Sequence, residues 1–255
     1  MNCGGLRTKG IHKCSTDKEP LLSIVTVVYN GKLTIEQTIQ SVIKQSYDNV
    51  EYIIVDGGST DGTLDIIKKY EDKIDYWQSE PDDGIYYAMN KGCTLAKGDY
   101  ICLLNADDWF EPYVCKTIAS KIIKEKYDVY YAIARVINQE GEIFDIQGCT
   151  VNILNRGSIA HQTAFIKKDI YNNYKYDTKY RSAADYDFFC RLKKDGVSFK
   201  FIDTIFVNYR LAGMSDSNIG QLETYKIKYK YKYIGFINYF VHFIFLKLLL
   251  LRGKK

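Results

Sequence analysis

The segment Tyr100–Phe110, with the sequence YICLLNADDWF, gives the main indication of the fold. Its first five residues are apolar, which is typical of a strand buried on both faces in a parallel sheet covered by helices. The apolar run is followed by two adjacent carboxylates, Asp107 and Asp108. Sheets of this kind place their ligands at the carboxyl ends of the strands. Two interpretations of the carboxylates remain open: oxygen ligands of a hard divalent cation, or a solvated turn that starts a helix.

Strands and helices alternate in the first half of the chain. Residues Thr34 and Gln37 have the spacing of a capping box at the start of the first helix. Because consecutive parallel strands are joined by right-handed crossovers, this alternation predicts a parallel sheet with helices on both faces. The strands expected in this half are Leu21–Tyr29, Glu51–Val55, Asp75–Ser79 and Tyr100–Leu104.

The second half of the chain predicts a mixture of strands and helices. Pro112 suits the first turn of a helix, and a Gly-Met-Ser loop is expected at 213–215. The other elements expected here are strands at Val129–Ile137, Ile143–Ile146, Ala160–Ile166, Phe199–Ile202 and Ile205–Tyr209, and a helix at Ala183–Asp195. This half is therefore expected to form a smaller mixed β/α part attached to the parallel half.

Charge is distributed unevenly along the 255 residues. The net charge is +4, but residues 221–255 hold eight Lys and Arg against the single acid Glu223, which is +7. The remaining 220 residues hold 27 basic and 30 acidic residues, which is −3. Since the basic excess is confined to an apolar tail, nucleic acid is not an expected partner.

The apolar segment Gly235–Leu251 has 17 residues and contains Lys247. It is at the short end for a bilayer span, and lysines precede and follow it. A helix that lies in the membrane interface, held by cations on anionic lipid, is favoured. A buried core helix and a true span are the alternatives.

The cysteines and the first twenty residues indicate a cellular compartment. The chain has seven Cys and no CxxC motif, which favours a reducing cytosol over disulfides or zinc knuckles. No apolar run of a signal peptide is visible in residues 1–20, which are expected to form a flexible tail. With the basic tail, these features predict a cytoplasmic protein associated peripherally with the inner face of the membrane.

Acidic residues follow several of the predicted strands. Asp56, Asp83, Asp107 and Asp108 are expected to converge, because the carboxyl ends of parallel strands meet at one edge. Such a cluster is costly without a cation or hydrogen-bond donors. A diphosphate bound through Mg²⁺ or Mn²⁺ would satisfy both signs of charge.

Five motifs occur in order along the chain: SIVTVVYN, EYIIVDGGSTDGT, SEPDDGIYYAMNKG, GDYICLLNADDWF and ADYDFFCRL. This set resembles the family 2 glycosyltransferases of the GT-A fold over about residues 22–215, in particular those that make bacterial capsule, exopolysaccharide or O-antigen. The resemblance implies an inverting transferase that uses a nucleotide-sugar donor, with a UDP-sugar favoured, and Mn²⁺ or Mg²⁺. It also implies a Rossmann-like, mostly parallel sheet. We expect a nucleotide-sugar half at 21–110, an acceptor and catalytic-base half at 111–220, and a membrane-associating segment at 221–255.

The resemblance also assigns donor-binding roles to particular residues. It implies that Asp56 accepts a hydrogen bond from the nucleotide base. It places Asp107 and Asp108 at the metal and the ribose, without deciding which of the two ligates the metal directly. The other residues implied at the donor are Val27, Tyr29, Asn30, Asp83, Asn90 and Asn105, with Lys91 as a candidate phosphate contact.

A single general base is implied on the acceptor side. Asp185 matches the family's catalytic base, and a helix N-terminus that favours acids is the structural alternative. His161, expected at the start of a strand, is similar to a histidine of related capsule enzymes and is a candidate contact to acceptor or phosphate. Two other functions compete: a sugar nucleotidyltransferase, and a non-catalytic donor-binding scaffold.

Overall fold

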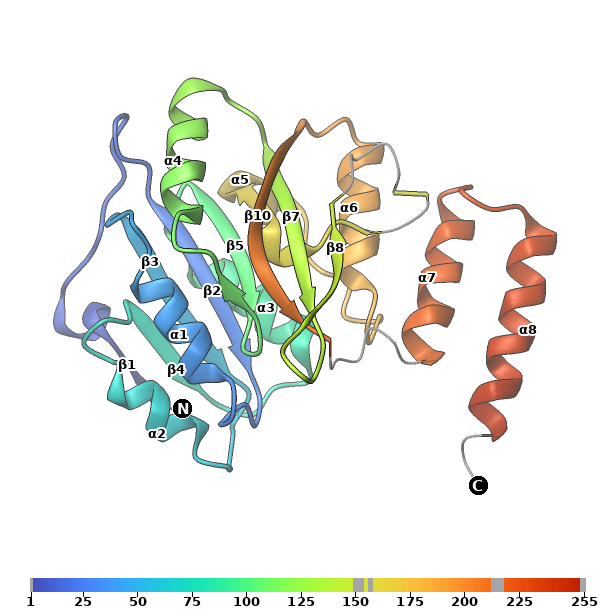
Figure 1. Cartoon of the computed structure of the whole chain (residues 1–255), viewed down its shortest axis with the longest axis horizontal. Helices are drawn as coiled ribbons and strands as arrows, with labels where there is room; N and C mark the ends of the chain where they lie inside the picture. The colour runs from blue at the N-terminus through green and yellow to red at the C-terminus, as the bar shows by residue number, and fades with distance from the viewer. Residues whose placement is uncertain (1, 149–153, 156–157, 212–217, 253–255) are drawn as a thin grey trace.

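A computed structural model describes residues 2–148, 154–155, 158–211 and 218–252 of the chain. Its ten strands form one continuous sheet in the order β1-β4-β3-β2-β5-β9-β7-β10-β6, with β8 paired to β7 (Figure 1). Four strands of the first half are parallel, as predicted: β2 (Leu22–Val28), β3 (Val50–Asp56), β4 (Tyr76–Ser79) and β5 (Tyr100–Asn105).

Two apolar cores lie on opposite faces of this sheet. Along β2, Val25 and Val27 belong to one core, whereas Ile24 and Val28 belong to the other. Successive side chains of a strand point to opposite faces, so a continuous apolar run supplies both cores. The prediction that these parallel strands are buried on both faces is therefore confirmed.

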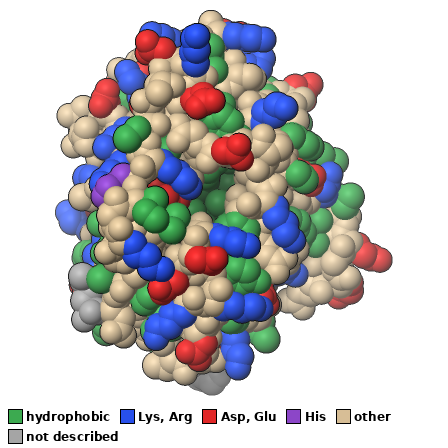
Figure 2. Space-filling view, turned by 90° about the vertical axis from the view of Figure 1, so that its left-hand side faces the viewer, with side chains coloured by type: hydrophobic (Ala, Val, Ile, Leu, Met, Phe, Trp, Pro, Cys, Tyr) green, Lys and Arg blue, Asp and Glu red, His purple; other side chains and the backbone are tan. Residues whose placement is uncertain are grey.

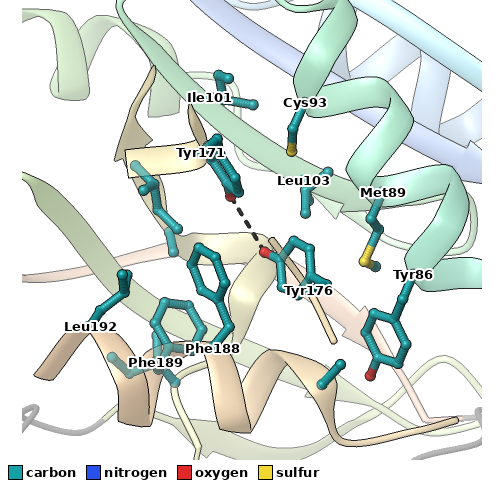
Figure 3. Packing of buried hydrophobic residues seen from close by; sticks show 14 of the residues in the cluster. Tyr86, Met89, Cys93, Ile101, Leu103, Tyr171, Tyr176, Phe188, Phe189 and Leu192 are labelled. Carbon is teal, nitrogen blue, oxygen red and sulfur yellow. Dashed lines mark hydrogen bonds between the residues drawn. The ribbon is translucent and has the colours of Figure 1, made fainter. Parts of the chain in front are cut away.

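Helices cover both faces of the sheet. One core includes α1 (Ile35–Ile43), α2 (Thr63–Lys69) and α4 (Val114–Lys124). The other includes α3 (Ile85–Leu95), α5 (Lys168–Asn173) and α6 (Ala184–Lys194). Figure 3 shows this second core, in which Tyr176 lies between Phe188 of α6 and Met89 of α3.

Helix α3 packs closely against β2, and helix α1 lacks the cap that was predicted for it. A Cβ at Gly92 would lie 2.3 Å from Val25 Cγ1, so glycine lets α3 approach β2 closely. The capping box predicted for α1 is not formed. Thr34 is the N-cap residue, but its hydroxyl donates to the Gly31 carbonyl at 3.4 Å and makes no cap bond.

The second half continues the same sheet. Strand β9 (Phe165–Lys167) pairs antiparallel with both β5 and β7 (Val129–Ile137), so β7 runs in the direction of β5. Strand β10 (Phe199–Arg210) is parallel to β7 and antiparallel to β6 (Trp109–Phe110). Strand β8 (Ile143–Gln147) forms a hairpin with β7. The carboxyl ends of β2, β5 and β10 consequently lie at one edge.

Two strand predictions for this half were wrong in detail. The strands expected at Phe199–Ile202 and Ile205–Tyr209 are one strand, β10, whose register shifts around Ile205. The strand expected at Ala160–Ile166 begins instead as a 3-10 helix, η3 (His161–Thr163), followed by β9. A local hydrogen bond explains the turn, because the Thr163 hydroxyl donates to the Ala160 carbonyl at 2.8 Å.

The N-terminal residues have defined contacts, contrary to the flexible tail that we expected. They form β1 (Asn2–Gly4), which pairs with β4, and the 3-10 helix η1 (Leu6–Lys9). Arg7 pairs with the buried Glu51, and Lys13 Nζ lies 2.9 Å from the buried Asp75. These cations supply the opposite charge for two buried carboxylates, which also accept hydrogen bonds from Ser23, Lys97 and Tyr52.

The C-terminal residues form two helices, α7 (Asn218–Lys230) and α8 (Phe236–Arg252), beside the sheet (Figure 1). Within the described part of the chain, no helix combines the length and the apolarity that a membrane crossing requires. Several large apolar side chains of α8 are exposed: Phe236, Ile237, Phe240, Val241, Ile244, Phe245 and Leu248. The loop predicted at 213–215 lies outside the described residues.

The six cysteines in described segments are free, four of them buried. On the face seen in Figure 2, basic and acidic side chains are intermixed and do not gather into a stripe of one sign.

Candidate active site

A cavity of about 1000 Å³ lies at the carboxyl edge of the sheet. Its walls come from segments that are far apart in the sequence: the ends of β2, β5 and β10, the start of α3, η3, and the turn before α6. Among its lining residues are Val27, Tyr29, Asn30, Tyr86, Asn105, Asp107, His161, Arg181, Ser182, Asp185 and Arg210. The cavity thus contains seven residues that the sequence singled out, including the proposed base.

The Asp185 carboxylate is held from two directions. The Tyr86 hydroxyl donates to Asp185 Oδ1 at 3.3 Å, and His161 Nδ1 lies 3.4 Å from Asp185 Oδ2. The other ring nitrogen of His161 is 3.4 Å from Asn105 Oδ1. A chain of contacts therefore connects the end of β5 with the candidate base through one imidazole.

Tyr86 remains a hydrogen-bond donor in this arrangement. Burial, and secondarily the negative charge of Asp185, raise the pKa of the Tyr86 phenol well above its ordinary value of 10.0. Since the phenol stays protonated, it can orient the carboxylate over the whole neutral and mildly alkaline range.

The adjacent carboxylates Asp107 and Asp108 have different environments. Asp107 lines the cavity, and burial raises its pKa above the ordinary value. Asp108 is fully buried, and its two oxygens accept hydrogen bonds from Gln162 Nε2 at 2.8 Å and from the Arg210 backbone N–H at 3.0 Å. Burial, followed by the charge of Asp107, raises the pKa of Asp108 strongly. The structure therefore brings Asp107 to the cavity and uses Asp108 to connect the loop to η3 and β10.

The donor atoms in the cavity fit a divalent cation that shares its ligands with a substrate. Residues 2–148, 154–155, 158–211 and 218–252 contain no cluster of three His, Cys, Asp or Glu able to enclose a metal. Mg²⁺ and similar ions are often held by one or two carboxylates together with phosphate oxygens and water. Asp107 is a carboxylate of this kind, so its position suits a cation bound jointly with a diphosphate.

Asp56 is engaged within its own loop. Its carboxylate is buried and accepts hydrogen bonds from the backbone N–H groups of Gly58 and Ser59, at 3.2 and 3.0 Å, and from the Ser79 hydroxyl at 2.6 Å. Ser59 Oγ in turn accepts from the Asn30 backbone N–H at 2.8 Å. Asp56 itself does not line the cavity. It holds this loop against Asn30, and Asn30 does line the cavity.

Three further predicted residues are not brought to the cavity. The Asn90 amide makes two 2.9 Å hydrogen bonds with the Tyr176 backbone. Lys91 forms an ion pair with Glu80, and Asp83 is exposed on the surface. Their donor-binding roles stay predictions, and the contacts of Asn90 and Lys91 are those of structural residues.

Two cavity cations were missed by the sequence reasoning. The Cζ atom of Arg210 lies 5.1 Å from the centroid of the Trp109 ring, and its Nη2 donates to Gln37 Oε1 at 2.8 Å. Its position one residue past a predicted strand was a usable signal, because that strand ends at the same edge. Arg181 precedes α6 in a turn, and no sequence pattern indicated that its side chain lines the cavity.

The arrangement defines an α/β protein with a cavity, lined by both carboxylates and arginines, at the carboxyl edge of its sheet, where such folds bind nucleotides. A family model described as "Glycosyl transferase family 2" matches residues 23–197, more than half of the chain. The chain therefore belongs to glycosyltransferase family 2, as its motifs predicted.

Curated relatives are named as glycosyltransferases or synthases. A "PGL/p-HBAD biosynthesis glycosyltransferase" of Mycobacterium bovis is 32% identical over 178 residues, which cover 66% of this chain and 68% of that protein. The "Chondroitin synthase" of Pasteurella multocida is 30% identical over 215 residues, covering 81% of this chain but only 22% of the synthase.

Solved structures share the fold. The Staphylococcus aureus protein TarS, residues 1–349 in complex with UDP-GlcNAc, superposes with a TM-score of 0.68 at 19% identity, covering 83% of this chain and 66% of TarS 1–349. The Pyrobaculum calidifontis mannosyltransferase PcManGT, in complex with GDP-Man and Mn²⁺, gives a TM-score of 0.60 at 15% identity, covering 88% of this chain and 67% of that one. These likenesses establish a GT-A-like architecture.

Proposed function

We propose that this chain is an inverting glycosyltransferase that moves a sugar from a UDP-sugar to a hydroxyl group of a glycan or lipid-linked acceptor in bacterial surface polysaccharide synthesis. The observation that carries the proposal is that Asp107 and Asp185 line one cavity, although 78 residues separate them in the chain. Membership in family 2 and the UDP-GlcNAc bound to TarS support the donor class.

Asp185 is the general base in this proposal. Its carboxylate takes the proton of the acceptor hydroxyl as that oxygen attacks the anomeric carbon from the face opposite the leaving diphosphate. Tyr86 and His161 hold the carboxylate for this step. His161 is also close enough to Asn105 to contact a phosphate or the acceptor at the same wall.

The donor is bound along the ends of β2 and β5. Val27, Tyr29 and Asn30 line the nucleotide end, with the Asp56 loop behind them. Asp107 would hold Mn²⁺ or Mg²⁺ together with the donor diphosphate, and the bound cation would neutralise negative charge on the departing nucleoside diphosphate. Arg181 and Arg210 add positive charge to the same cavity.

A donor screen tests the proposal. Purified protein is incubated with a panel of nucleotide-sugars and a mixture of lipid-linked and glycan acceptors, with Mn²⁺ or with excess EDTA, and nucleoside diphosphate release is measured. We expect release from a UDP-sugar that EDTA abolishes and that Asp185→Asn reduces strongly. In a parallel incubation with nucleoside triphosphates and sugar 1-phosphates, release of pyrophosphate would indicate the nucleotidyltransferase alternative. Donor binding without turnover in any combination would indicate the scaffold.

Peripheral association with the cytoplasmic face of the membrane belongs to the same proposal. The exposed apolar side chains of α8 form one helix surface, and exposed lysines lie on the helix and connection before it, at 226 and 232. Apolar contact together with cations suits the interface of an anionic bilayer. A lipid-linked acceptor would be found at that surface.

A further inference from the structure

The helix that carries Asp185 starts without a cap of its own. Its N-cap residue is Ala183, whose side chain cannot accept a hydrogen bond, and the helix has no side-chain cap bond. Alanine is a poor residue at this position because it leaves backbone N–H groups at the helix start without a local acceptor. The turn before the helix also supplies Arg181 and Ser182 to the cavity wall.

Glu223 of α7 accepts hydrogen bonds from the turn before this helix and from its N-cap residue. Its Oε1 accepts the backbone N–H of Arg181 at 2.8 Å, and its Oε2 accepts those of Ser182 and Ala183 at 2.9 and 3.1 Å. Glu223 is only 8% exposed. A carboxylate at a helix N-terminus is favoured by both the hydrogen bonds and the helix dipole.

The same face of α7 interacts with α6 and its core at two further residues, Ile227 and Lys230. Ile227 is fully buried in the core that contains α6. Lys230 Nζ lies 2.7 Å from Oδ1 of the buried Asp187, whose Oδ2 also accepts from Arg191 Nε at 2.8 Å. Since residues four and seven apart lie on one helix face, α7 holds α6 along two turns.

We propose that Glu223 is a positioning residue for sugar transfer: it fixes the turn 181–183, and thereby the direction in which Asp185 faces the acceptor hydroxyl. This inference rests on the proposed role of Asp185 as base. It also places the control of base geometry in the C-terminal helical pair, outside the segment 23–197 matched by the family model.

The test is a double-variant cycle in the full-length chain. Glu223→Gln keeps the size of the side chain but replaces one carboxylate oxygen by an NH₂ group that cannot accept. We expect kcat, normalised to the concentration of UDP-binding sites, to fall about tenfold, because a small displacement of a catalytic group slows the reaction. The KM for the donor should stay within about twofold of wild type. Gln221→Ala, at an exposed position on the same helix, is the matched control and should be unchanged.

Coupling to Asp185 distinguishes positioning from a general structural role. In the Asp185→Asn background, Glu223→Gln should produce no further loss, because the residue acts through the base. Additive losses in the double variant, or wild-type kcat in Glu223→Gln, overturn the inference. Full activity of Asp185→Asn would instead overturn the proposed function. If Glu223→Gln does not fold, the shorter carboxylate of Glu223→Asp takes its place in the cycle, with the same expected and overturning outcomes.

Discussion

Two parts of the cavity are held together in different ways: the proposed nucleotide edge, formed by Val27, Tyr29 and Asn30 with the Asp56 loop behind them, and the proposed base wall, formed by Tyr86, His161 and Asp185. At the nucleotide edge, Asp56 is bonded to Gly58 and Ser59, two and three residues along the chain. At the base wall, Asp185 is held by Tyr86, 99 residues away, and its helix by Glu223. Local hydrogen bonds make the first region recognisable as a motif, whereas the second exists only after the chain has folded.

The largest expected effect falls on the base wall. Asp185→Asn should lower kcat about 10³-fold, because the amide cannot accept the acceptor proton and general-base catalysis contributes factors of this order. UDP affinity, measured by calorimetry with Mn²⁺, should stay within about twofold, since the nucleotide edge does not depend on Asp185. Loss of UDP binding in this variant would show that the two regions are not separable.

The next effect separates the two carboxylates at the end of β5. Asp107→Asn should weaken Mn²⁺-dependent donor binding about 100-fold while leaving thermal stability close to that of wild type. Asp108→Asn should instead lower the free energy of unfolding by about 1–3 kcal/mol, because Gln162 and the Arg210 N–H lose part of their buried acceptor.

Calorimetry of donor binding and thermal denaturation of both variants check this pair. A reversed result, with Asp108→Asn abolishing metal dependence and Asp107→Asn unfolding the protein, would contradict the assignment of Asp107 to the cation.

A smaller effect is expected at Tyr86. Tyr86→Phe should lower kcat about fivefold by removing a hydrogen bond to a carboxylate while keeping the ring. Because the pKa of Tyr86 is raised above 10.0, its proton is retained as pH rises, so the ratio between wild type and variant should be constant from about pH 6 to pH 10. A ratio that shrinks on the alkaline side would mean that Tyr86 ionises in this range.

The smallest effect on chemistry is expected at α8, outside both regions. Ile237→Glu should reduce co-sedimentation with vesicles containing anionic lipid, since it places a carboxylate on the exposed apolar surface. Turnover of a water-soluble acceptor should stay within about twofold, because Ile237 lies outside the cavity.

Asn238→Glu, which adds the same charge at the next, polar position, is the control and should retain more vesicle binding. A point substitution is preferable to removing residues 221–255, because that deletion would also remove Glu223 and the buried Ile227. Vesicle binding of Ile237→Glu equal to wild type would contradict the proposed membrane surface.

Sequence patterns were sufficient for the parallel half of the fold. Strand β5 begins as a continuous apolar run, β2 is a buried run of mostly apolar residues that includes Ser23 and Thr26, and both end in polar turns. The helices between the strands have apolar stripes of their own. The second half was predicted less well. A hydrogen bond from Thr163 replaced the start of a strand by a 3-10 helix, and β10 joined two predicted strands into one. Neither feature has a signature in side-chain periodicity.

The site divides in the same way. The acids at the strand ends were identifiable because Asp is expected at such turns and because the motifs occur in order. The difference between Asp107 and Asp108 was not, since both are aspartates of one turn and only Gln162 and β10 distinguish them. Arg181 and Glu223 carried no local signal at all.

By itself, the sequence determined the family, the parallel sheet, and the edge at which the acids collect, because apolar periodicity and turn chemistry act over a few residues. Only the tertiary structure decided which carboxylate faces the cavity, what orients Asp185, and that Glu223 of α7 binds the turn before α6. These outcomes depend on contacts between residues 40 to 102 positions apart, and hydrogen-bond geometry across such distances is a property of the packed chain.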